Sequence, residues 1–219
     1  MSRPSSRVLS QLAHDLRSPL SVIGSSLTEL SKETGLTAAD RVDLLALSQR
    51  AVKRLLSLSD RLSLAASLEQ PLEPKLAPMD LVKLTRVTLE QYVATNARRR
   101  VEVVTVFPAA PLRVSADGAL LATLLLELLS NANRFAHRLL RVEVAAGAGA
   151  VVNIDDDGEG LKEDEREVLF EPFAERRSRT GLGMGLWLAR SLAELHQGTL
   201  TVTNLSPGTR QQLTLPLLT

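Results

Sequence analysis

Residues 118–138 read GALLATLLLELLSNANRFAHR, and this stretch decides the fold of the larger part of the chain. Glu127, Asn131 and Arg134 stand at positions i, i+4 and i+7, which brings them onto one stripe of an α-helix. Leucine and alanine fill most of the other positions, so the pattern predicts one long helix over the whole stretch. The polar stripe is either the wet face of a surface helix or one wall of a binding site.

The sequence on both sides of this helix predicts a mixed α/β domain. Further helices are expected from Leu81 to about Asn96 and from Gly183 to His196. Strands are expected at 101–107, 140–146, 151–154, 199–204 and 209–215, with a turn at Ser206-Pro207-Gly208 between the last two. This order favours a mixed α/β sandwich over residues 79–219, with helices on one face of a sheet.

The first part of the chain has a different pattern, in which apolar residues recur alternately three and four positions apart between Leu9 and Leu30. Such a stripe is typical of a coiled-coil or bundle seam. Thr37 is an expected N-cap, and the helix that follows it carries Leu45, Val52, Leu55 and Leu62. Residues 1–69 are therefore predicted to form an antiparallel helical hairpin.

The hairpin has a consequence for assembly. One hairpin cannot bury a two-sided seam by itself, so we expect a homodimer in which two hairpins form a four-helix bundle. Residues 70–78 contain three prolines and are predicted to be a linker. The expected fold class is α+β, with the dimeric helical bundle followed by the sandwich.

Composition excludes several classes of function. Lys and Arg number 26 against 25 for Asp and Glu, so the net charge of +1 gives no reason to expect nucleic acid or an anionic membrane as the partner. The absence of cysteine excludes disulfides and thiolate metal sites. No apolar run approaches the roughly 20 residues of a membrane span, and the N-terminus lacks the apolar stretch of a signal peptide. We expect a cytoplasmic location.

His14 is the first residue with candidate chemistry. It lies two positions from both Leu12 and Leu16, so at about 100° per residue it projects away from the seam and should be exposed. A lone histidine of this kind is more often an ordinary surface residue, and Pro19 would bend the helix beside it by removing a backbone N–H. A nucleophilic imidazole needs one free nitrogen and the other held as a donor, which a nearby carboxylate can arrange.

Two glycine-containing segments follow in the second domain. Asp155-Asp156-Asp157-Gly158-Glu159-Gly160 comes directly after a predicted strand and could be no more than a turn. Gly181-Leu182-Gly183-Met184-Gly185 opens a predicted helix, whose free N–H groups and dipole suit a phosphate. Either segment alone is weak evidence of function.

Taken together and in this order, the segments resemble those of sensor histidine kinases of two-component systems. The stretch from His14 to Leu20 resembles the phosphoacceptor box, and Glu127 to Phe135 resembles the N-box of the ATP-binding domain. The other matches are the first glycine box at 155–160, the phenylalanine box at 170–173 and the second glycine box at 181–185. The resemblance runs from about Leu9 to Pro216 and implies a phosphoacceptor hairpin followed by an ATP-binding domain.

The resemblance also implies a reaction. Such a kinase uses ATP and Mg²⁺ to phosphorylate His14, and then transfers the phosphoryl group to an aspartate in the receiver domain of a response regulator. Asp15 would hold one ring nitrogen of His14 as a donor. Asn131 would coordinate Mg²⁺, and Arg134 would contact phosphates in place of the more usual lysine. Asp156 would accept a hydrogen bond from the adenine amino group, a contact that disfavours the carbonyl of guanine.

The glycines have implied roles in the same site. Gly158 and Gly160 would let the backbone approach the base. Gly181, Gly183 and Gly185 would surround the phosphates at the start of a helix. Three arginines between these boxes are candidates to neutralise the triphosphate, or else form a solvated charged run: Arg176, Arg177 and Arg179.

Two positions depart from the family pattern. Ser18 lies one turn after His14, where relatives with phosphatase activity usually carry Thr or Asn, so we expect weak or absent phosphatase activity. Glu127 replaces the common Asn and matches the Glu-x-x-x-Asn pattern of gyrase, Hsp90 and MutL ATPases. It could bind Mg²⁺, activate water or be a solvated residue, and we favour the metal ligand.

Two other functions remain open at this point. One is a non-catalytic phosphotransfer adapter with a decayed ATP domain, which the intact Asp156 and Asn131 argue against. The other is a chaperone-like or topoisomerase-like ATPase, which is suggested by Glu127 alone and opposed by the phosphoacceptor box. We therefore predict an ATP-dependent protein-histidine kinase.

Overall fold

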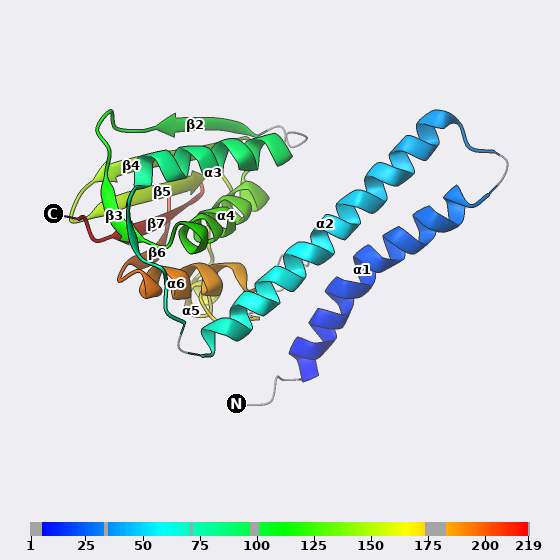
Figure 1. The fold of residues 1–219 in the computed structure, drawn as a ribbon, viewed down its shortest axis with the longest axis horizontal. Coiled ribbons are helices and arrows are strands. Elements are labelled where there is room, and N and C mark those ends of the chain that lie inside the picture. The colour runs from blue at the N-terminus through cyan, green and yellow to red at the C-terminus, as the bar shows by residue number, and fades with distance from the viewer. Residues whose placement is uncertain (1–5, 33–34, 71, 97–100, 174–182, 219) are drawn as a thin grey trace. The chain divides into compact units, whose positions relative to one another are not determined.

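The computed structural model describes residues 6–32, 35–70, 72–96, 101–173 and 183–218 (Figure 1). The chain divides into two compact units, a helical unit at the N-terminus and an α/β unit from Leu72 onward. Over the described ranges, no helix combines the length and the apolar character needed to cross a membrane.

The helical unit is a hairpin of α1 (Ser6–Leu30) and α2 (Ala38–Leu68), as predicted (Figure 1). α2 begins with a capping box. The Thr37 hydroxyl accepts from the Asp40 backbone N–H at 3.2 Å, and the Asp40 carboxylate accepts from the Thr37 N–H at 2.9 Å. The two bonds give partners to backbone N–H groups that the start of a helix would otherwise leave unpaired. The start of α2 is therefore determined by residues close to it in the sequence.

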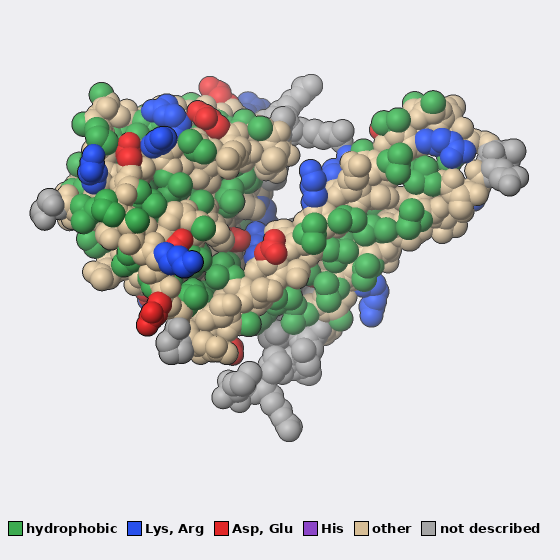
Figure 2. Space-filling model, in the orientation of Figure 1, with side chains coloured by type: hydrophobic (Ala, Val, Ile, Leu, Met, Phe, Trp, Pro, Cys, Tyr) green, Lys and Arg blue, Asp and Glu red, His purple; other side chains and the backbone are tan. Residues whose placement is uncertain are grey.

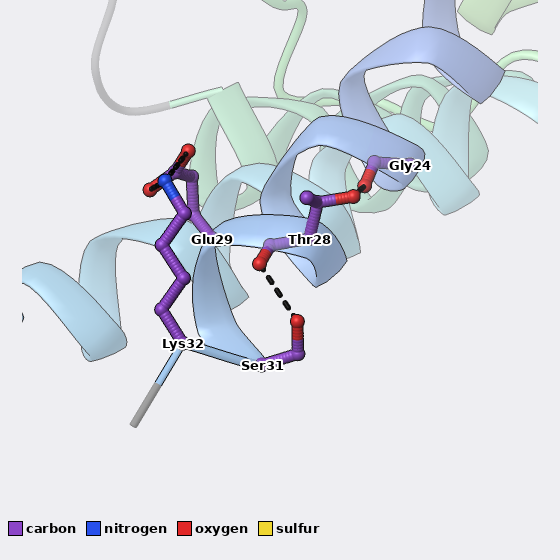
Figure 3. A network of polar contacts seen from close by, with 5 residues as sticks. All are labelled: Gly24, Thr28, Glu29, Ser31 and Lys32. Carbon is purple, nitrogen blue, oxygen red and sulfur yellow. Dashed lines mark hydrogen bonds and ion pairs between the residues drawn. The ribbon is translucent and has the colours of Figure 1, made fainter. Parts of the chain in front are cut away.

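The end of α1 is held by side chains of its own last turns (Figure 3). The Thr28 hydroxyl donates to the Gly24 carbonyl at 2.9 Å, and the Ser31 hydroxyl donates to the Thr28 carbonyl at 2.8 Å. Lys32 forms an ion pair with Glu29 at 2.7 Å, and both side chains are well exposed. The Ser31 bond supplies a donor to a carbonyl of the last helical turn, where such groups lack partners in the helix.

The two helices of the hairpin leave much of their apolar surface exposed. Asp15, Pro19 and Ser26 on α1 are buried, whereas Leu20 and Leu27 are 55% and 56% exposed. α2 has exposed apolar side chains as well, namely Val42, Leu45, Leu47, Val52 and Leu56. Figure 2 shows apolar side chains along the visible face of the hairpin. The predicted seam is therefore open in a single chain.

The α/β unit contains a five-stranded sheet with the order β2-β4-β5-β7-β6. β2 and β4 are parallel, and the other neighbours are antiparallel. A separate ribbon pairs β1 (Ala77–Asp80) with β3 (Arg113–Ala116). The strands of the sheet are β2 (Glu102–Val106), β4 (Leu139–Ala146), β5 (Ala150–Asp156), β6 (Thr199–Asn204) and β7 (Thr209–Leu215).

Helices cover one face of this sheet, which confirms the predicted architecture (Figure 1). α4 (Gly118–Phe135) packs on β5 and β7, α6 (Gly185–Leu195) lies beside α4 and on β6, and α3 (Leu81–Asn96) packs on α4. The five leucines of α4 that form the centre of the core are Leu121, Leu124, Leu125, Leu128 and Leu129. Each contributes about 1.5–3 kcal/mol when fully buried. The strands β1 and β3 and the short helix α5 (Glu163–Glu167) were not predicted.

α4 is shorter than the sequence predicts, since it ends at Phe135 instead of at about Arg138. The reason is Asp157, whose carboxylate accepts from the backbone N–H groups of His137, Arg138 and Leu139 at 2.8, 3.0 and 3.1 Å. In a longer helix those N–H groups would bond to carbonyls four residues earlier. A carboxylate twenty residues away in the sequence thus ends the helix.

α6 also starts later than predicted, at Gly185 instead of Gly183. Gly183 has a φ of +66°, in the left-handed region that a right-handed helix excludes. The other end of α6 is joined to the start of α4 by the buried His196. Its Nδ1 lies 2.7 Å from the Leu192 carbonyl oxygen, which only accepts, so Nδ1 carries the proton and Nε2 accepts from the Asp117 N–H at 3.1 Å.

Replacing Asp157 with Ala should destabilise the α/β unit by about 1–3 kcal/mol, because three backbone donors lose a charged acceptor. Burial raises the pKa of Asp157, but the N–H groups of Arg138, Leu139 and His137 outweigh it and hold the pKa below the ordinary 3.8. The folded form therefore gains stability from the ionised carboxylate above about pH 4, and loses it as the pH falls through the lowered pKa.

The measurement is urea unfolding followed by the fluorescence of Trp187, the single tryptophan, which lies in α6. Glu90→Ala removes an exposed carboxylate from α3 of the same unit and should change little. The difference between wild type and Asp157→Ala should shrink between pH 7 and pH 3. A difference that stays constant over that range would contradict the assignment.

Candidate functional site

The three consecutive aspartates at the end of β5 have three different environments. Asp155 forms a two-pronged ion pair with Arg210, with Oδ1–Nε and Oδ2–Nη2 distances of 2.8 and 2.7 Å. Asp157 holds the backbone after α4, as described above. Asp156 is buried, and its oxygens accept from the Gly158 N–H at 2.9 Å and from the Thr209 hydroxyl. The acidic run is therefore more than a solvated turn.

Burial determines the electrostatics of Asp156. It raises the pKa of this carboxyl above the ordinary 3.8, although the Thr209 hydroxyl and the backbone N–H groups of Gly158 and Thr209 oppose the change, and the neighbouring charge of Asp157 adds to it. An ionised carboxylate only accepts hydrogen bonds. The site therefore presents a desolvated acceptor that a ligand donor would stabilise.

The polar stripe of α4 is not a wet helix face. Glu127 is only 6% exposed, and Asn131 and Arg134 are half-buried. The NH₂ group (Nδ2) of Asn131 donates a hydrogen bond to Oε1 of Gln211 on β7, at a distance of 3.0 Å. The guanidinium of Arg134 lies 5.3 Å from the ring centroid of Phe135. The reading of Glu127 as a solvated residue is therefore wrong.

Close approaches at two glycines bring separate motifs together. A Cβ at Gly158 would lie 2.6 Å from the Phe135 carbonyl oxygen and 2.8 Å from Oδ1 of Asp156, so the first glycine box sits against the end of the N-box helix. A Cβ at Gly185 would lie 2.9 Å from Oε2 of Glu127, so the start of α6 sits against the middle of that helix. The structure thus joins three of the predicted boxes around α4.

The remaining site residues of the α/β unit have simpler surroundings. Gly160 has a φ of +79° and lies beside the side chain of Asn204. The guanidinium carbon of Arg190 lies over the ring of Phe170, 4.9 Å from the ring centroid. This contact connects the phenylalanine box to α6. The other predicted residues lie outside the described residues: Gly181, Arg176, Arg177 and Arg179.

His14 lies on α1 with 68% of its side chain exposed, as predicted. Its Nδ1 lies 3.3 Å from Oδ1 of Asp15, which is buried. Adjacent positions of a helix do not face each other, but these two side chains reach one another directly. Ser18 is exposed one turn further along, and Pro19 is buried inside the helix.

Two residues of the α/β site were missed at the sequence level, Thr209 and Gln211. Both lie on β7 and both face the helices, because inward positions alternate along that strand. A polar residue at an inward position was the available signal, since a buried polar side chain requires a partner. The partner itself is set by packing between distant segments.

The described residues include no cluster of three or more His, Cys, Asp or Glu side chains placed to hold a metal ion. Mg²⁺ usually keeps several waters and is bound through one or two protein oxygens together with substrate phosphates. The amide of Asn131 and the carboxylate of Glu127 are oxygen donors of the required kind.

Comparison with known families agrees with this arrangement. Residues 5–71 match the His Kinase A (phospho-acceptor) domain. Residues 116–219 match the family described as histidine kinase-, DNA gyrase B-, and HSP90-like ATPase. The first match covers the hairpin that carries His14, and the second covers the segments that surround α4.

Individual relatives extend the match over nearly the whole chain. The chain is 29% identical over 204 residues to the swarming motility regulation sensor protein RssA of Serratia marcescens, covering 90% of this chain and 43% of RssA. It is 30% identical over 223 residues to the histidine protein kinase DivJ of Caulobacter vibrioides, covering 97% of this chain and 37% of DivJ. The crystal structure of full-length ShkA in complex with AMPPNP has a TM-score of 0.70 and 26% identity, over 96% of this chain and 46% of that one.

The fold and the two sites define a protein with a phosphoacceptor hairpin and an ATP-binding domain. The chain belongs to the sensor histidine kinases and corresponds to their catalytic core. It spans less than half the length of RssA and of DivJ.

Gly158→Ala should destabilise the α/β unit by about 1–3 kcal/mol, because the new methyl group meets a backbone carbonyl that cannot move aside cheaply. Gly147→Ala is the matched control, since a Cβ there has only an ordinary contact of 3.5 Å with Val151. Urea unfolding monitored by Trp187 measures both variants. Equal stabilities would show that the contact of Gly158 with the end of α4 is not tight.

Proposed function

We propose that this chain phosphorylates its own His14 with Mg-ATP in the cytoplasm and passes the phosphoryl group to an aspartate in the receiver domain of a response regulator. The observation that carries the proposal is an exposed imidazole whose Nδ1 faces a buried carboxylate at 3.3 Å, in a chain that also has an ATPase-type domain. The pairing holds the ring in an orientation that suits a nucleophile.

The pairing with Asp15 defines which nitrogen reacts. A proton on Nδ1 that is donated to Asp15 leaves the lone pair of Nε2 free and exposed. Nε2 then forms a bond to the γ-phosphorus, the bond from that phosphorus to the bridging oxygen breaks, and ADP leaves with the electron pair. Asp15 stabilises the positive charge that the ring acquires, by accepting a hydrogen bond from Nδ1–H, and the proton stays on Nδ1.

In the transfer to the receiver domain, the bond between the phosphorus and His14 is broken again. A carboxylate oxygen of the receiver attacks the phosphorus, the nitrogen–phosphorus bond breaks, and Nε2 regains its lone pair. The product is an acyl phosphate on the partner and a neutral His14. The exposure of His14 supports this step, because a second protein must reach it.

The ATP site that we propose has two ends. At the adenine end, Asp156 accepts from the amino group while Gly158 and Gly160 keep the backbone close to the base. To the phosphate end we assign Arg134 and the three glycines of the second glycine box, Gly181, Gly183 and Gly185. The binding of AMPPNP by ShkA, whose structure this chain resembles, supports a nucleotide here.

The metal belongs to the phosphate end. When bound, Mg²⁺ neutralises charge on the β- and γ-phosphates. Asn131 would hold it through the amide oxygen Oδ1. Glu127 lies one helical turn earlier and against the start of α6, so we assign it a second oxygen contact, direct or through water. A role for Glu127 as a base for water would consume ATP that His14 requires.

Dimerisation is part of the proposal. The exposed leucines of α1 and the exposed apolar residues of α2 supply the surface that a second hairpin would bury. Ser18 is exposed one turn after His14 and is our candidate for any phosphatase activity. We expect that activity to be weak, because serine holds a water with a freer rotamer than threonine.

His14→Gln should abolish labelling by γ-labelled ATP, since it removes the only imidazole on the hairpin. The intact chain should acquire an acid-labile, base-stable phosphoryl group. His137→Gln is the matched control, because His137 is also exposed but lies in the α/β unit, and it should keep the label. Label retained by His14→Gln at the original level would refute the proposed phosphoacceptor.

Asp156→Asn should weaken ATP binding about tenfold to a hundredfold, the equivalent of one hydrogen bond to a charged group. The fold should lose no more than about 1–3 kcal/mol, because the amide still pairs with the Gly158 N–H and the Thr209 hydroxyl but cannot also accept from the Thr209 backbone N–H. Titration calorimetry and urea unfolding measure the two effects.

The pH dependence gives an independent test of the same residue. Since the pKa of Asp156 lies above 3.8, chiefly through burial, ATP affinity should fall as the pH drops through that raised value and the acceptor is protonated. Wild type should lose affinity over this interval, and Asp156→Asn should not follow it. Parallel curves for the two proteins would remove Asp156 from the adenine contact.

A further inference from the structure

Gln211 occupies an unusual position in the core. It lies in β7 with 0% exposure, at an inward position between the buried Thr209 and Leu213. Both halves of its amide are hydrogen-bonded. Oε1 accepts from Nδ2 of Asn131 at 3.0 Å, and Nε2 donates to the backbone carbonyl of Leu128 at 3.2 Å. A buried amide that is fully paired in this way has one stable orientation.

The chemistry of the partners defines that orientation. The Leu128 oxygen can only accept, so Gln211 must turn its NH₂ group toward it. Oε1 of Gln211 then faces Asn131, and because this oxygen only accepts, Asn131 must donate to it from its NH₂ group. In a planar amide the oxygen lies on the other side from that donor. Oδ1 of Asn131, the one atom of this side chain able to ligate a cation, is thereby directed away from Gln211.

We infer that Gln211 is a positioning residue for the metal ligand: it holds the Asn131 amide with its oxygen toward the Mg-triphosphate. The inference rests on the proposed function, in which Asn131 binds Mg²⁺. An unheld asparagine amide can turn over and present its NH₂ group, which repels a cation. The carbonyl of Leu128 is fixed within α4, so it fixes the orientation of the Gln211 amide. Gln211 in turn fixes the orientation of the Asn131 amide.

The relay also connects the two ends of the proposed ATP site. Thr209 stands two residues before Gln211 on the same face of β7, about 6.4–6.8 Å away along the strand, and its hydroxyl pairs with Asp156. One strand therefore orients the acceptor at the adenine end and the amide at the metal end. The spacing between these groups is set by strand geometry instead of by a loop.

The test uses Gln211→Met in the full chain, because methionine keeps the length and the flexible, unbranched shape but has no amide. Titration calorimetry measures the affinity for the non-hydrolysable analogue AMPPNP, once with Mg²⁺ and once with EDTA. We expect the gain in affinity that Mg²⁺ provides to fall about threefold to tenfold, the equivalent of one neutral hydrogen bond. The affinity in EDTA should stay as in wild type.

Gln212→Met is the matched control. Gln212 is the adjacent residue, half-buried, and it points to the other face of the sheet, where it donates to Asn153 at 2.9 Å. It should leave the affinities with Mg²⁺ and with EDTA unchanged. A general weakening of the fold would lower both affinities in Gln211→Met alike, whereas a lost metal-ligand orientation lowers only the first. An unchanged gain from Mg²⁺ in Gln211→Met would overturn the inference.

Asn131→Ala separates this inference from the function on which it rests. If this variant loses the gain from Mg²⁺ and Gln211→Met keeps it, the positioning role fails and the metal ligand stands. If Asn131→Ala keeps the gain, Asn131 is not the ligand and both proposals fail.

A measurement on the wild-type protein covers the case in which Gln211→Met does not fold. Hydrogen exchange of the Asn131 side-chain NH₂ group, followed by nuclear magnetic resonance, should be slower than that of an exposed asparagine. Exchange at the exposed rate would overturn the inference without any variant.

Discussion

The α/β unit depends on one constraint, the requirement that polar groups placed inside the core be hydrogen-bonded. An unpaired buried polar group costs about 1–3 kcal/mol. The inward face of β7 presents Thr209 and Gln211 to the helix layer, so each needs a partner there. The partners are Asp156 and Asn131, the two residues that carry the proposed nucleotide site. The hydrogen bonds that satisfy the buried polar groups of β7 are therefore the same bonds that fix the geometry of the proposed site.

The hairpin is governed by a different constraint, apolar area. Its two helices bury one side of each other and leave leucines such as Leu20 and Leu27 more than half exposed. Exposed apolar rows of this length are interaction surfaces in most soluble proteins. His14 lies off that row and stays exposed, so covering the leucines with a second hairpin is compatible with access to the imidazole. Sequence periodicity separates the two functions on one helix.

Periodicity made much of the fold predictable. α3, β6 and β7 have the bounds that the sequence predicts, because their apolar patterns are set by local burial. β1 and β3 are only four residues each, and one contains Pro78, so they have no period to detect and depend on pairing with each other. The end of α4 was misplaced for a similar reason, since its determinant, Asp157, is remote in the sequence.

The candidate site divides in the same way. Residues with unusual chemistry for their position, such as His14, Asn131 and Asp156, could be predicted from motifs. Their partners Thr209 and Gln211 could not, because each pairing depends on register and packing, as in the alignment of Asp156 with Thr209 across β5 and β7. The burial of Glu127 also required the structure, since helical spacing gives a stripe but not the neighbour that covers it.

The raised pKa of Asp156 shows how stability and selectivity are connected in this domain. Burial disfavours the charged carboxylate, and its bonds to Thr209 and Gly158 offset that penalty only in part. A carboxylic acid at the surface would avoid the penalty, but it would stay hydrated and discriminate poorly between ligands. A desolvated acceptor rejects a carbonyl far more strongly than water-exposed groups do, because the mismatch leaves two acceptors facing each other. The free-energy cost of burying the ionised Asp156 in the free domain is therefore what makes the proposed site selective for an amino group.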